Sequence, residues 1–163
     1  MNTIHIAASR EYDVLIGHGL LDELGLLVAG AVDAKTAAIV SDDSVFALYG
    51  KRAAAALERV GLRVISFVFP HGESSKNLTV YGQVLNFLCE NRVSRTDVVV
   101  ALGGGVVGDL AGFAAATYLR GIRFIQVPTT LLAMVDSSVG GKTAVDLDGG
   151  KNQAGAFWQP SLV

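Results

Sequence analysis

The sequence contains a single cysteine, Cys89, among its 163 residues. One thiol cannot form a disulfide within the chain, and sparse cysteine is typical of proteins kept in the reducing cytoplasm. The first ten residues also lack the basic stretch and apolar run of a secretory signal. We therefore expect a cytoplasmic protein that folds without disulfide bonds.

Long apolar runs and a strong net charge are also missing. No window reaches the roughly 18 consecutive apolar residues that a transmembrane helix requires. Nevertheless, 51% of the residues are hydrophobic and the mean hydropathy is +0.46. A net charge of −2 provides no strong field for nucleic acid or for an acidic membrane surface. We expect neither as a partner, and the apolar residues must form a buried core or an interface with another domain.

Strand-like and helix-like segments alternate along the chain. The expected strands cover residues 3–8, 12–16, 36–40, 63–69, 97–102 and 123–127, and the expected helices cover residues 20–28, 45–60, 78–91 and 106–119. This alternation indicates βαβ units. The sequence thus predicts one α/β domain over residues 1–163, with a Rossmann-like, mostly parallel sheet, helices on both faces and a short β pair at the amino terminus. Residues 159–163 look like the start of a further strand, which suggests one domain of a longer enzyme.

A glycine-rich turn follows the expected strand 97–102. Gly103, Gly105 and Gly108 form a GxGxxG pattern. Glycines let backbone amides approach a pyrophosphate, and the start of a helix adds unpaired N–H groups. The alternative is a structural role, because glycine-rich turns also close tight strand–helix corners where no ligand binds. The acidic residue usually found about 20 residues later is absent, so this is not the ordinary first unit of a dehydrogenase.

Two other loops follow expected strands, where ligands of open α/β sheets collect. Asp42 is placed to bind a ribose, and the alternative is that Asp42 and Asp43 cap the next helix; the two roles are compatible, one for each residue. The loop 70–76 contains Glu73 and Lys76, which could reach adenosine hydroxyls. A solvated turn explains that loop equally well.

The segment 127–143 gathers hydroxyls, a carboxylate, two glycines and a lysine behind a strand, and Lys151 and Asn152 follow a glycine pair. Lysines and an asparagine flanked by glycines supply charges and donors for a phosphorylated substrate. Residues 136–143 end in Gly-Lys-Thr, but Asp136 stands where a P-loop needs its first glycine. This difference argues against an ATP or GTP site.

The runs 102–109, 120–130, 135–146, 150–152 and 155–160 closely resemble the 3-dehydroquinate synthase family. The resemblance covers nearly the whole chain and is dense from about Asp97 onward. Other sugar-phosphate cyclases share the triple glycine, the Pro-Thr-Thr and the Gly-Lys-Asn elements. Residues 135–143 followed by residues 155–160 are similar to the dehydroquinate branch.

This resemblance implies conversion of 3-deoxy-D-arabino-heptulosonate 7-phosphate, a seven-carbon sugar acid, to 3-dehydroquinate in the shikimate pathway. Phosphate is released, and NAD acts transiently as hydride acceptor. The family's NAD-binding residues fall on Asp42, Glu73, Lys76, Gly104, Gly105, Asp109, Thr129, Thr130, Lys142 and Lys151. Its catalytic and substrate-binding residues fall on Arg120, Asp136, Lys142 and Asn152, the last two near the phosphate. His71 and Ser44 depart from residues often seen in relatives.

The resemblance also implies a divalent metal, zinc or cobalt, held by one glutamate and two histidines of a following helical domain. The histidines here, His5, His18 and His71, form no close pair with one another. We therefore expect residues 1–163 to be an NAD-binding domain that pairs as a homodimer and is inactive alone. The alternatives are another sugar-phosphate cyclase, a glycerol or polyol dehydrogenase of the same architecture, and a domain that mainly dimerises through the apolar segment 106–119.

Overall fold

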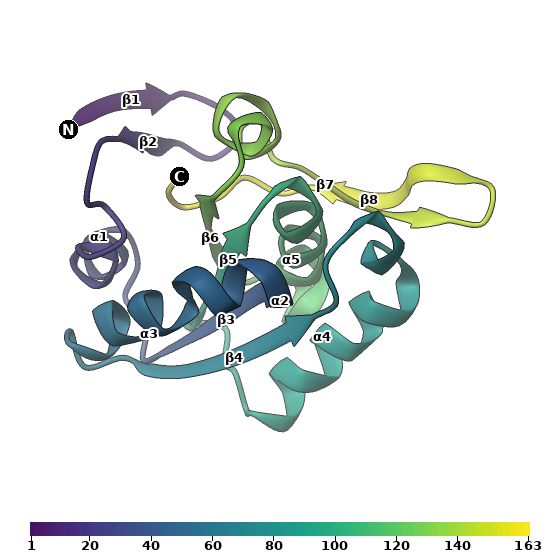
Figure 1. Ribbon diagram of the computed structural model, residues 1–163, viewed down its shortest axis with the longest axis horizontal. Coiled ribbons are helices and arrows are strands. Elements are labelled where there is room, and N and C mark those ends of the chain that lie inside the picture. Colours follow the sequence, from purple (N-terminus) through teal and green to yellow (C-terminus); the bar gives the residue numbers. More distant parts are fainter.

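Four parallel strands form the centre of the fold, in the order β4-β3-β5-β6. The computed structural model describes all 163 residues, and Figure 1 shows these strands between layers of helices. They are β3 (Thr36–Asp42), β4 (Arg63–Phe69), β5 (Val98–Gly103) and β6 (Arg123–Pro128). β3 and β5 are buried along almost their whole length because both of their faces are covered. The expectation of a Rossmann-like parallel sheet is confirmed.

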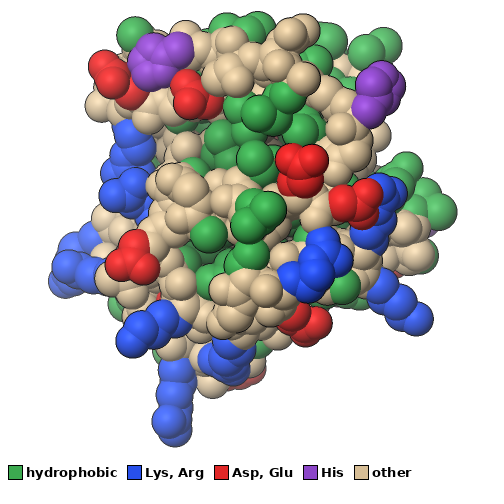
Figure 2. All heavy atoms as spheres, turned by 90° about the vertical axis from the view of Figure 1, so that its left-hand side faces the viewer, with side chains coloured by type: hydrophobic (Ala, Val, Ile, Leu, Met, Phe, Trp, Pro, Cys, Tyr) green, Lys and Arg blue, Asp and Glu red, His purple; other side chains and the backbone are tan.

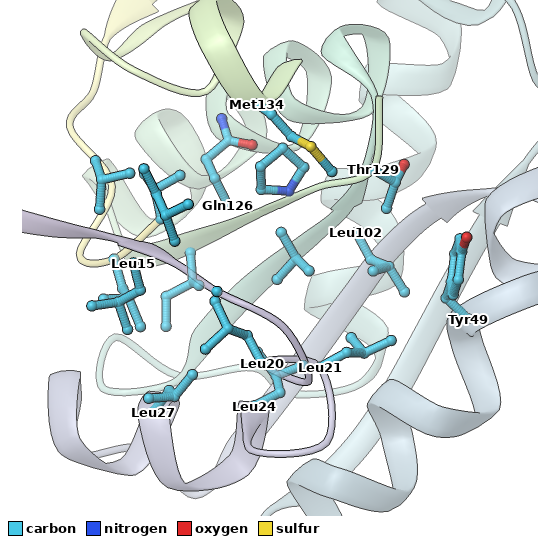
Figure 3. A pocket seen from close by; sticks show the side chains of 18 of the residues that line it. Leu15, Leu20, Leu21, Leu24, Leu27, Tyr49, Leu102, Gln126, Thr129 and Met134 are labelled. Carbon is cyan, nitrogen blue, oxygen red and sulfur yellow. The ribbon is translucent and has the colours of Figure 1, made fainter. Parts of the chain in front are cut away.

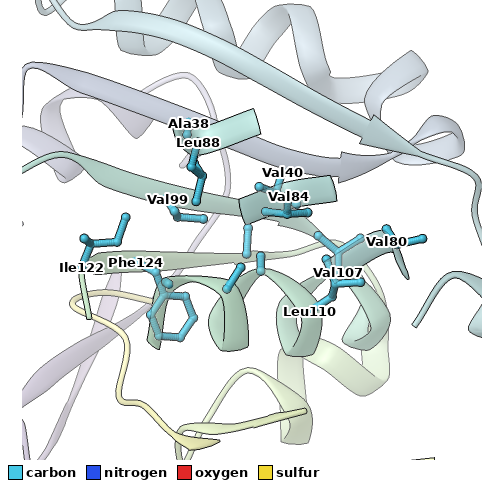
Figure 4. Packing of buried hydrophobic residues seen from close by; sticks show 14 of the residues in the cluster. Ala38, Val40, Val80, Val84, Leu88, Val99, Val107, Leu110, Ile122 and Phe124 are labelled. Atoms are coloured by element: carbon cyan, nitrogen blue, oxygen red, sulfur yellow. The ribbon is translucent and has the colours of Figure 1, made fainter. Parts of the chain in front are cut away.

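Helices cover both faces of this sheet and divide the core into two clusters. On one face lie α1 (Leu24–Ala31), α2 (Asp43–Val45), the π turn η1 (Phe46–Gly50) and α3 (Lys51–Glu58); on the other lie α4 (Leu78–Glu90) and α5 (Gly105–Thr117). Successive strand residues point to opposite faces. Ala38 and Val40 of β3 therefore pack with α4 and α5 (Figure 4), and Ala37 and Ile39 pack with α1 and α3.

The amino-terminal β pair forms as expected. β1 (Asn2–Ile6) pairs antiparallel with β2 (Tyr12–Ile16). Residues 161–163 connect this pair to the central sheet, because their backbone bonds to β6 on one side and to β2 on the other. Ser161 N donates to Phe124 O at 2.8 Å, and Leu15 N donates to Val163 O at 2.8 Å. Leu162 makes isolated β-bridges to Asp13 and Ile125, so these residues add single bridges rather than the further strand that was expected.

An antiparallel hairpin, which was not expected from the sequence, is formed by β7 (Lys142–Leu147) and β8 (Gly150–Phe157). The hairpin lies along α5, and Thr143 and Val145 are buried. Gly112 of α5 makes this packing possible, because a Cβ there would lie 2.4 Å from Cγ2 of Thr143. Short one-turn helices lie at η2 (Glu73–Ser75), η3 (Tyr118–Arg120) and η4 (Ala133–Ser137).

Several expected helix boundaries differ from the structure by two to four residues, including both ends of α1 and the end of α5. α1 begins at Leu24 rather than at residue 20, because tight turns precede it, with Asp22 N donating to Gly19 O at 2.9 Å. α5 ends at Thr117 rather than at residue 119, because Leu119 has a φ of 51° and leaves the helical conformation. The longest helices, α4 and α5, have 13 residues, and no helix is long and apolar enough to cross a membrane.

Asp97 ties together the beginnings of β3 and β5. Its Oδ1 accepts hydrogen bonds from the backbone N–H groups of Thr36 at 2.8 Å and Lys35 at 3.2 Å, and its Oδ2 accepts one from Ser94 N at 2.7 Å. Burial raises the pKa of this carboxyl, but the hydrogen bonds outweigh burial and hold the pKa below its usual value. The folded state therefore favours the ionised form.

We expect Asp97→Asn to lower the free energy of unfolding by about 2 kcal/mol at pH 7, because an amide cannot accept all three bonds. A lowered folded pKa gives stability that is present above the unfolded pKa of about 3.9 and is lost as the pH falls through the folded pKa. Urea denaturation from pH 7 to pH 3 should show the difference between the two proteins shrinking. The matched Asp148→Asn change removes an exposed carboxylate without hydrogen bonds and should have little effect; a difference that is constant across this pH range would contradict the account.

Candidate functional site at the carboxyl edge of the sheet

The strand order reverses between β3 and β5, so their carboxyl ends open a crevice. Asp42 ends β3 and Gly103 ends β5, on neighbouring strands. Asp42 caps the following helix, with Oδ1 accepting from Val45 N at 2.8 Å, while its Oδ2 makes no hydrogen bond within the protein. The predicted capping role is thus confirmed, and one carboxylate oxygen remains for a ligand.

Asp43 does not face this crevice in the same way, because it holds the loop 70–76. Its Oδ1 accepts from His71 N at 3.1 Å and lies 2.7 Å from His71 Nδ1. These bonds to His71 lower the pKa of the Asp43 carboxyl. His71 therefore fastens the loop that carries Glu73 and Lys76.

The glycine turn leaves the start of α5 open. No side chain caps this helix, whose first turn follows Gly104, so its first N–H groups point outward without partners. A Cβ on Gly104 would lie 3.0 Å from Thr130 Cγ2, and a Cβ on Gly105 would lie 3.0 Å from Ser137 Oγ. The segment after β6 therefore approaches the turn closely, and a larger residue at either glycine would require these side chains to shift. The arrangement fits an anionic group bound by backbone amides.

Two hydroxyl groups beside this turn are buried and have no partner. They are Thr129 Oγ1 and Ser137 Oγ. The backbone of Thr129 is fixed by a 3.0 Å hydrogen bond from its N–H to Gly103 O. A buried polar group without a partner is unfavourable by about 1–3 kcal/mol, and such groups are commonly satisfied by a ligand or by water. Ser137 has no distinguishing signal in the sequence, because it is one serine within a polar segment.

Lys76 joins three separate elements of the site. Its Nζ donates to Asp109 Oδ2 on α5 and to Asn152 Oδ1 on β8, both at 2.5 Å, and the residue is only 5% exposed. Burial raises the pKa of the Asp109 carboxyl, and the ammonium groups of Lys76 and Lys142 oppose that rise. An ammonium group has three donors, so one N–H of Lys76 remains for a ligand.

The other lysines flank this group at the hairpin. Lys151 Nζ lies 3.1 Å from Glu73 Oε1, and this contact raises the pKa of Lys151. Lys142 begins β7 after a glycine turn whose Gly140 N–H donates to the Tyr12 hydroxyl at 3.1 Å. Its exposed ammonium opposes the rise in the pKa of Asp109. Asp136 is exposed on η4, next to Ser137.

Arg120 is the predicted site residue that the structure does not bring to this crevice. The site lies at the start of α5, whereas Arg120 follows the end of that helix. Thirteen helical residues separate the two ends by about 20 Å. Within one chain, Arg120 is therefore too distant to contact a ligand at the glycine turn.

A large apolar cavity adjoins the polar site on the side of β2 and α1. Its volume is about 740 Å³, and most of its lining is hydrophobic. Figure 2 shows hydrophobic side chains gathered around a hollow on this face, and Figure 3 shows Leu20, Leu24 and Met134 directed into the cavity. Of the predicted site residues only Thr129 lines it. The charged groups that could perform chemistry therefore lie beside the cavity rather than in it. No three His, Cys, Asp or Glu side chains come together to hold a metal ion.

Comparisons with known proteins identify relatives of the whole chain. The 3-dehydroquinate synthase of Symbiobacterium thermophilum is 54% identical over 94% of this chain and 43% of its own length. That of Ruegeria pomeroyi is 48% identical over the whole chain and 44% of its own length. The chain thus spans less than half the length of the curated relatives it matches.

A solved 2-deoxy-scyllo-inosose synthase, complexed with carbaglucose-6-phosphate, NAD⁺ and Co²⁺, has a TM-score of 0.92 at 31% identity. The match covers 99% of this chain and 44% of that one. Glycerol dehydrogenases match at 20–21% identity, which shows only a shared fold.

The family described as 3-dehydroquinate synthase N-terminal matches residues 66–163. These residues include the glycine turn, Lys76, Asp109 and the hairpin. The match covers more than half of the sequence, and it agrees with the curated relatives. The chain therefore belongs to the 3-dehydroquinate synthase family, as its amino-terminal part.

Proposed function

We propose that these residues form the NAD-binding domain of an enzyme that converts 3-deoxy-D-arabino-heptulosonate 7-phosphate to 3-dehydroquinate with release of phosphate. The main support for this proposal is that Lys76 bonds to both Asp109 and Asn152 beside the start of α5, which no side chain caps. This arrangement offers donors to a dinucleotide and to a phosphorylated substrate in one crevice. NAD supplies the hydride acceptor when bound.

The residues present fit NAD. The N–H groups after Gly104 would hold the pyrophosphate, and the second oxygen of Asp42 would accept from a ribose hydroxyl. The unpaired hydroxyls of Thr129 and Ser137 would gain partners. Lys76, held by Asp109, would keep one N–H directed to the ligand, and Thr130, Glu73 and Lys151 would enclose the bound molecule.

The phosphorylated substrate requires the cationic side of the crevice. Lys142 and the amide NH₂ of Asn152 would hold its phosphate as point charge and donor. Asp136, exposed beside them, would accept from a substrate hydroxyl. We assign the divalent metal, zinc or cobalt, to ligands outside these 163 residues and expect the domain alone to bind NAD without turnover. Phosphate release by this chain supplied with zinc and substrate would contradict that assignment.

We expect Thr129→Val to weaken NAD binding by about fivefold while stabilising the ligand-free protein, because it removes an unpaired buried hydroxyl that a ligand would satisfy. Thr143→Val is the matched control, since its hydroxyl donates to Ala156 O at 2.7 Å. That change should destabilise the protein and leave NAD affinity unchanged. Isothermal titration and thermal unfolding measure both effects.

Absence of any binding heat at millimolar NAD would refute the NAD assignment. Equal affinities of the Thr129→Val variant and the wild type would refute the role of this hydroxyl alone. Accumulation of NADH with glycerol as substrate would instead indicate a polyol dehydrogenase.

The position of Arg120 leads us to propose a homodimer in which this side chain reaches the substrate of the second copy. A complementation experiment in the complete enzyme tests this directly. Arg120→Ala and Lys142→Ala homodimers should both be inactive. A mixed dimer would contain one site with both residues intact, so a random equal mixture should recover about a quarter of the wild-type activity. No recovery, with mixed dimers shown to form, would place Arg120 in its own chain's site or in a structural role.

A further inference from the structure

The β7–β8 hairpin has an irregularity at Asp146. Val145 pairs with Ala154 and Leu147 pairs with Gly150, so Asp146 alone faces the three residues 151–153. In this bulge Asn152 adopts a φ of 56°. Residues other than glycine seldom adopt this left-handed backbone conformation, and asparagine is among the few that tolerate it. Some interaction must therefore hold Asn152 there.

Asp146 provides that interaction. Its Oδ1 accepts a hydrogen bond from the backbone N–H of Asn152 at 2.7 Å. Its own backbone N–H donates to Lys76 O at 2.9 Å. The same residue therefore fixes the conformation of the bulge and ties the hairpin to the loop that carries Lys76.

The consequence is a defined orientation for the Asn152 side chain. Lys76 Nζ has only donors, so the group that faces it at 2.5 Å is the carbonyl oxygen Oδ1 of Asn152. The NH₂ group of the same amide then points away from Lys76 and has no partner within the protein. It is a donor that is directed before any ligand arrives.

We propose that Asp146 is a positioning residue, which holds Asn152 in its left-handed conformation so that the amide meets Lys76 and presents its NH₂ group to an anionic ligand. This inference rests on the proposed function in one respect, namely that a phosphorylated substrate is the ligand. The interaction itself belongs to the ligand-free protein.

The chain allows the hydrogen bond to be separated from the charge of Asp146. Asp146→Asn keeps an acceptor oxygen for Asn152 N–H and removes the charge, whereas Asp146→Ala removes both. The backbone bond from residue 146 to Lys76 O remains in each variant. Asp148→Ala is the matched control. It removes an exposed carboxylate of the same hairpin, and this carboxylate makes no hydrogen bond to Asn152.

Amide hydrogen exchange of the ligand-free protein, followed by NMR, tests the positioning step. Exchange at Asn152 should accelerate by about fivefold in Asp146→Ala, and should stay near the wild-type rate in Asp146→Asn and Asp148→Ala. Val145 and Ala154 should remain protected, which separates local release of Asn152 from unfolding of the hairpin. Unchanged exchange at Asn152 in Asp146→Ala would overturn the inference.

Affinity for inorganic phosphate, the group that Asn152 is proposed to hold, then tests whether positioning matters for binding. Asp146→Ala should weaken binding by about fivefold, with most of the affinity retained in Asp146→Asn. The double variant Asp146→Ala, Asn152→Ala should bind no more weakly than Asn152→Ala alone, because Asp146 acts through Asn152. Additive losses would overturn the positioning role. If the wild-type chain binds no phosphate, the proposed function fails at its substrate site, whereas the exchange experiment still decides the positioning of Asn152.

Discussion

The candidate site depends on the contacts that the buried ammonium group of Lys76 makes with Asp109 and Asn152. This ammonium group lies between a carboxylate on α5 and an amide on β8, so the loop after β4, the helix after the glycine turn and the hairpin all meet at one charge. Removing one partner of a buried ion pair is unfavourable by roughly 3–5 kcal/mol, because the other charge is left without compensation. The three elements are therefore held in one arrangement before a ligand binds.

This arrangement divides the carboxyl edge of the sheet into two parts. The polar part, around Lys76 and the start of α5, has unpaired donors and hydroxyls. The apolar part, between β2, α1 and β6, is a cavity lined mainly by hydrophobic side chains. Thr129 lies at the boundary, because it lines the cavity and its backbone bonds to Gly103. A dinucleotide suits such a boundary, since its phosphates require donors and its rings require apolar surface.

Most of the central fold could be predicted from the sequence, because its causes are local. Apolar runs ending at glycine or proline mark β5 and β6, and the Asp42 cap follows from one residue type at one position. The hairpin could not be predicted in this way. Lysine, glycine and asparagine have low strand propensity, and the packing of the hairpin on α5 depends on the space that Gly112 leaves for Thr143.

The site was predictable in its residue types but not in its contacts. The motifs identified Lys76 and Asn152, yet the two are 76 positions apart and their hydrogen bond arises only when the hairpin packs along α5. The positioning role that we propose for Asp146 has no signal in the sequence, because an aspartate near a turn is ordinary. Arg120 differs from Lys76 and Asn152 in the opposite way. Its motif lies close in sequence to the other predicted site residues, but the length of α5 places it at the other end of the domain.

The central claim is that NAD binds at the polar edge beside Lys76. The most direct measurement is an NMR titration of the isotope-labelled chain with NAD. The account predicts that the largest shifts occur at the backbone amides of Gly104, Gly105 and Thr129. Shifts confined to the apolar cavity, at residues such as His18 and Leu21, or no shifts at millimolar NAD, would contradict it.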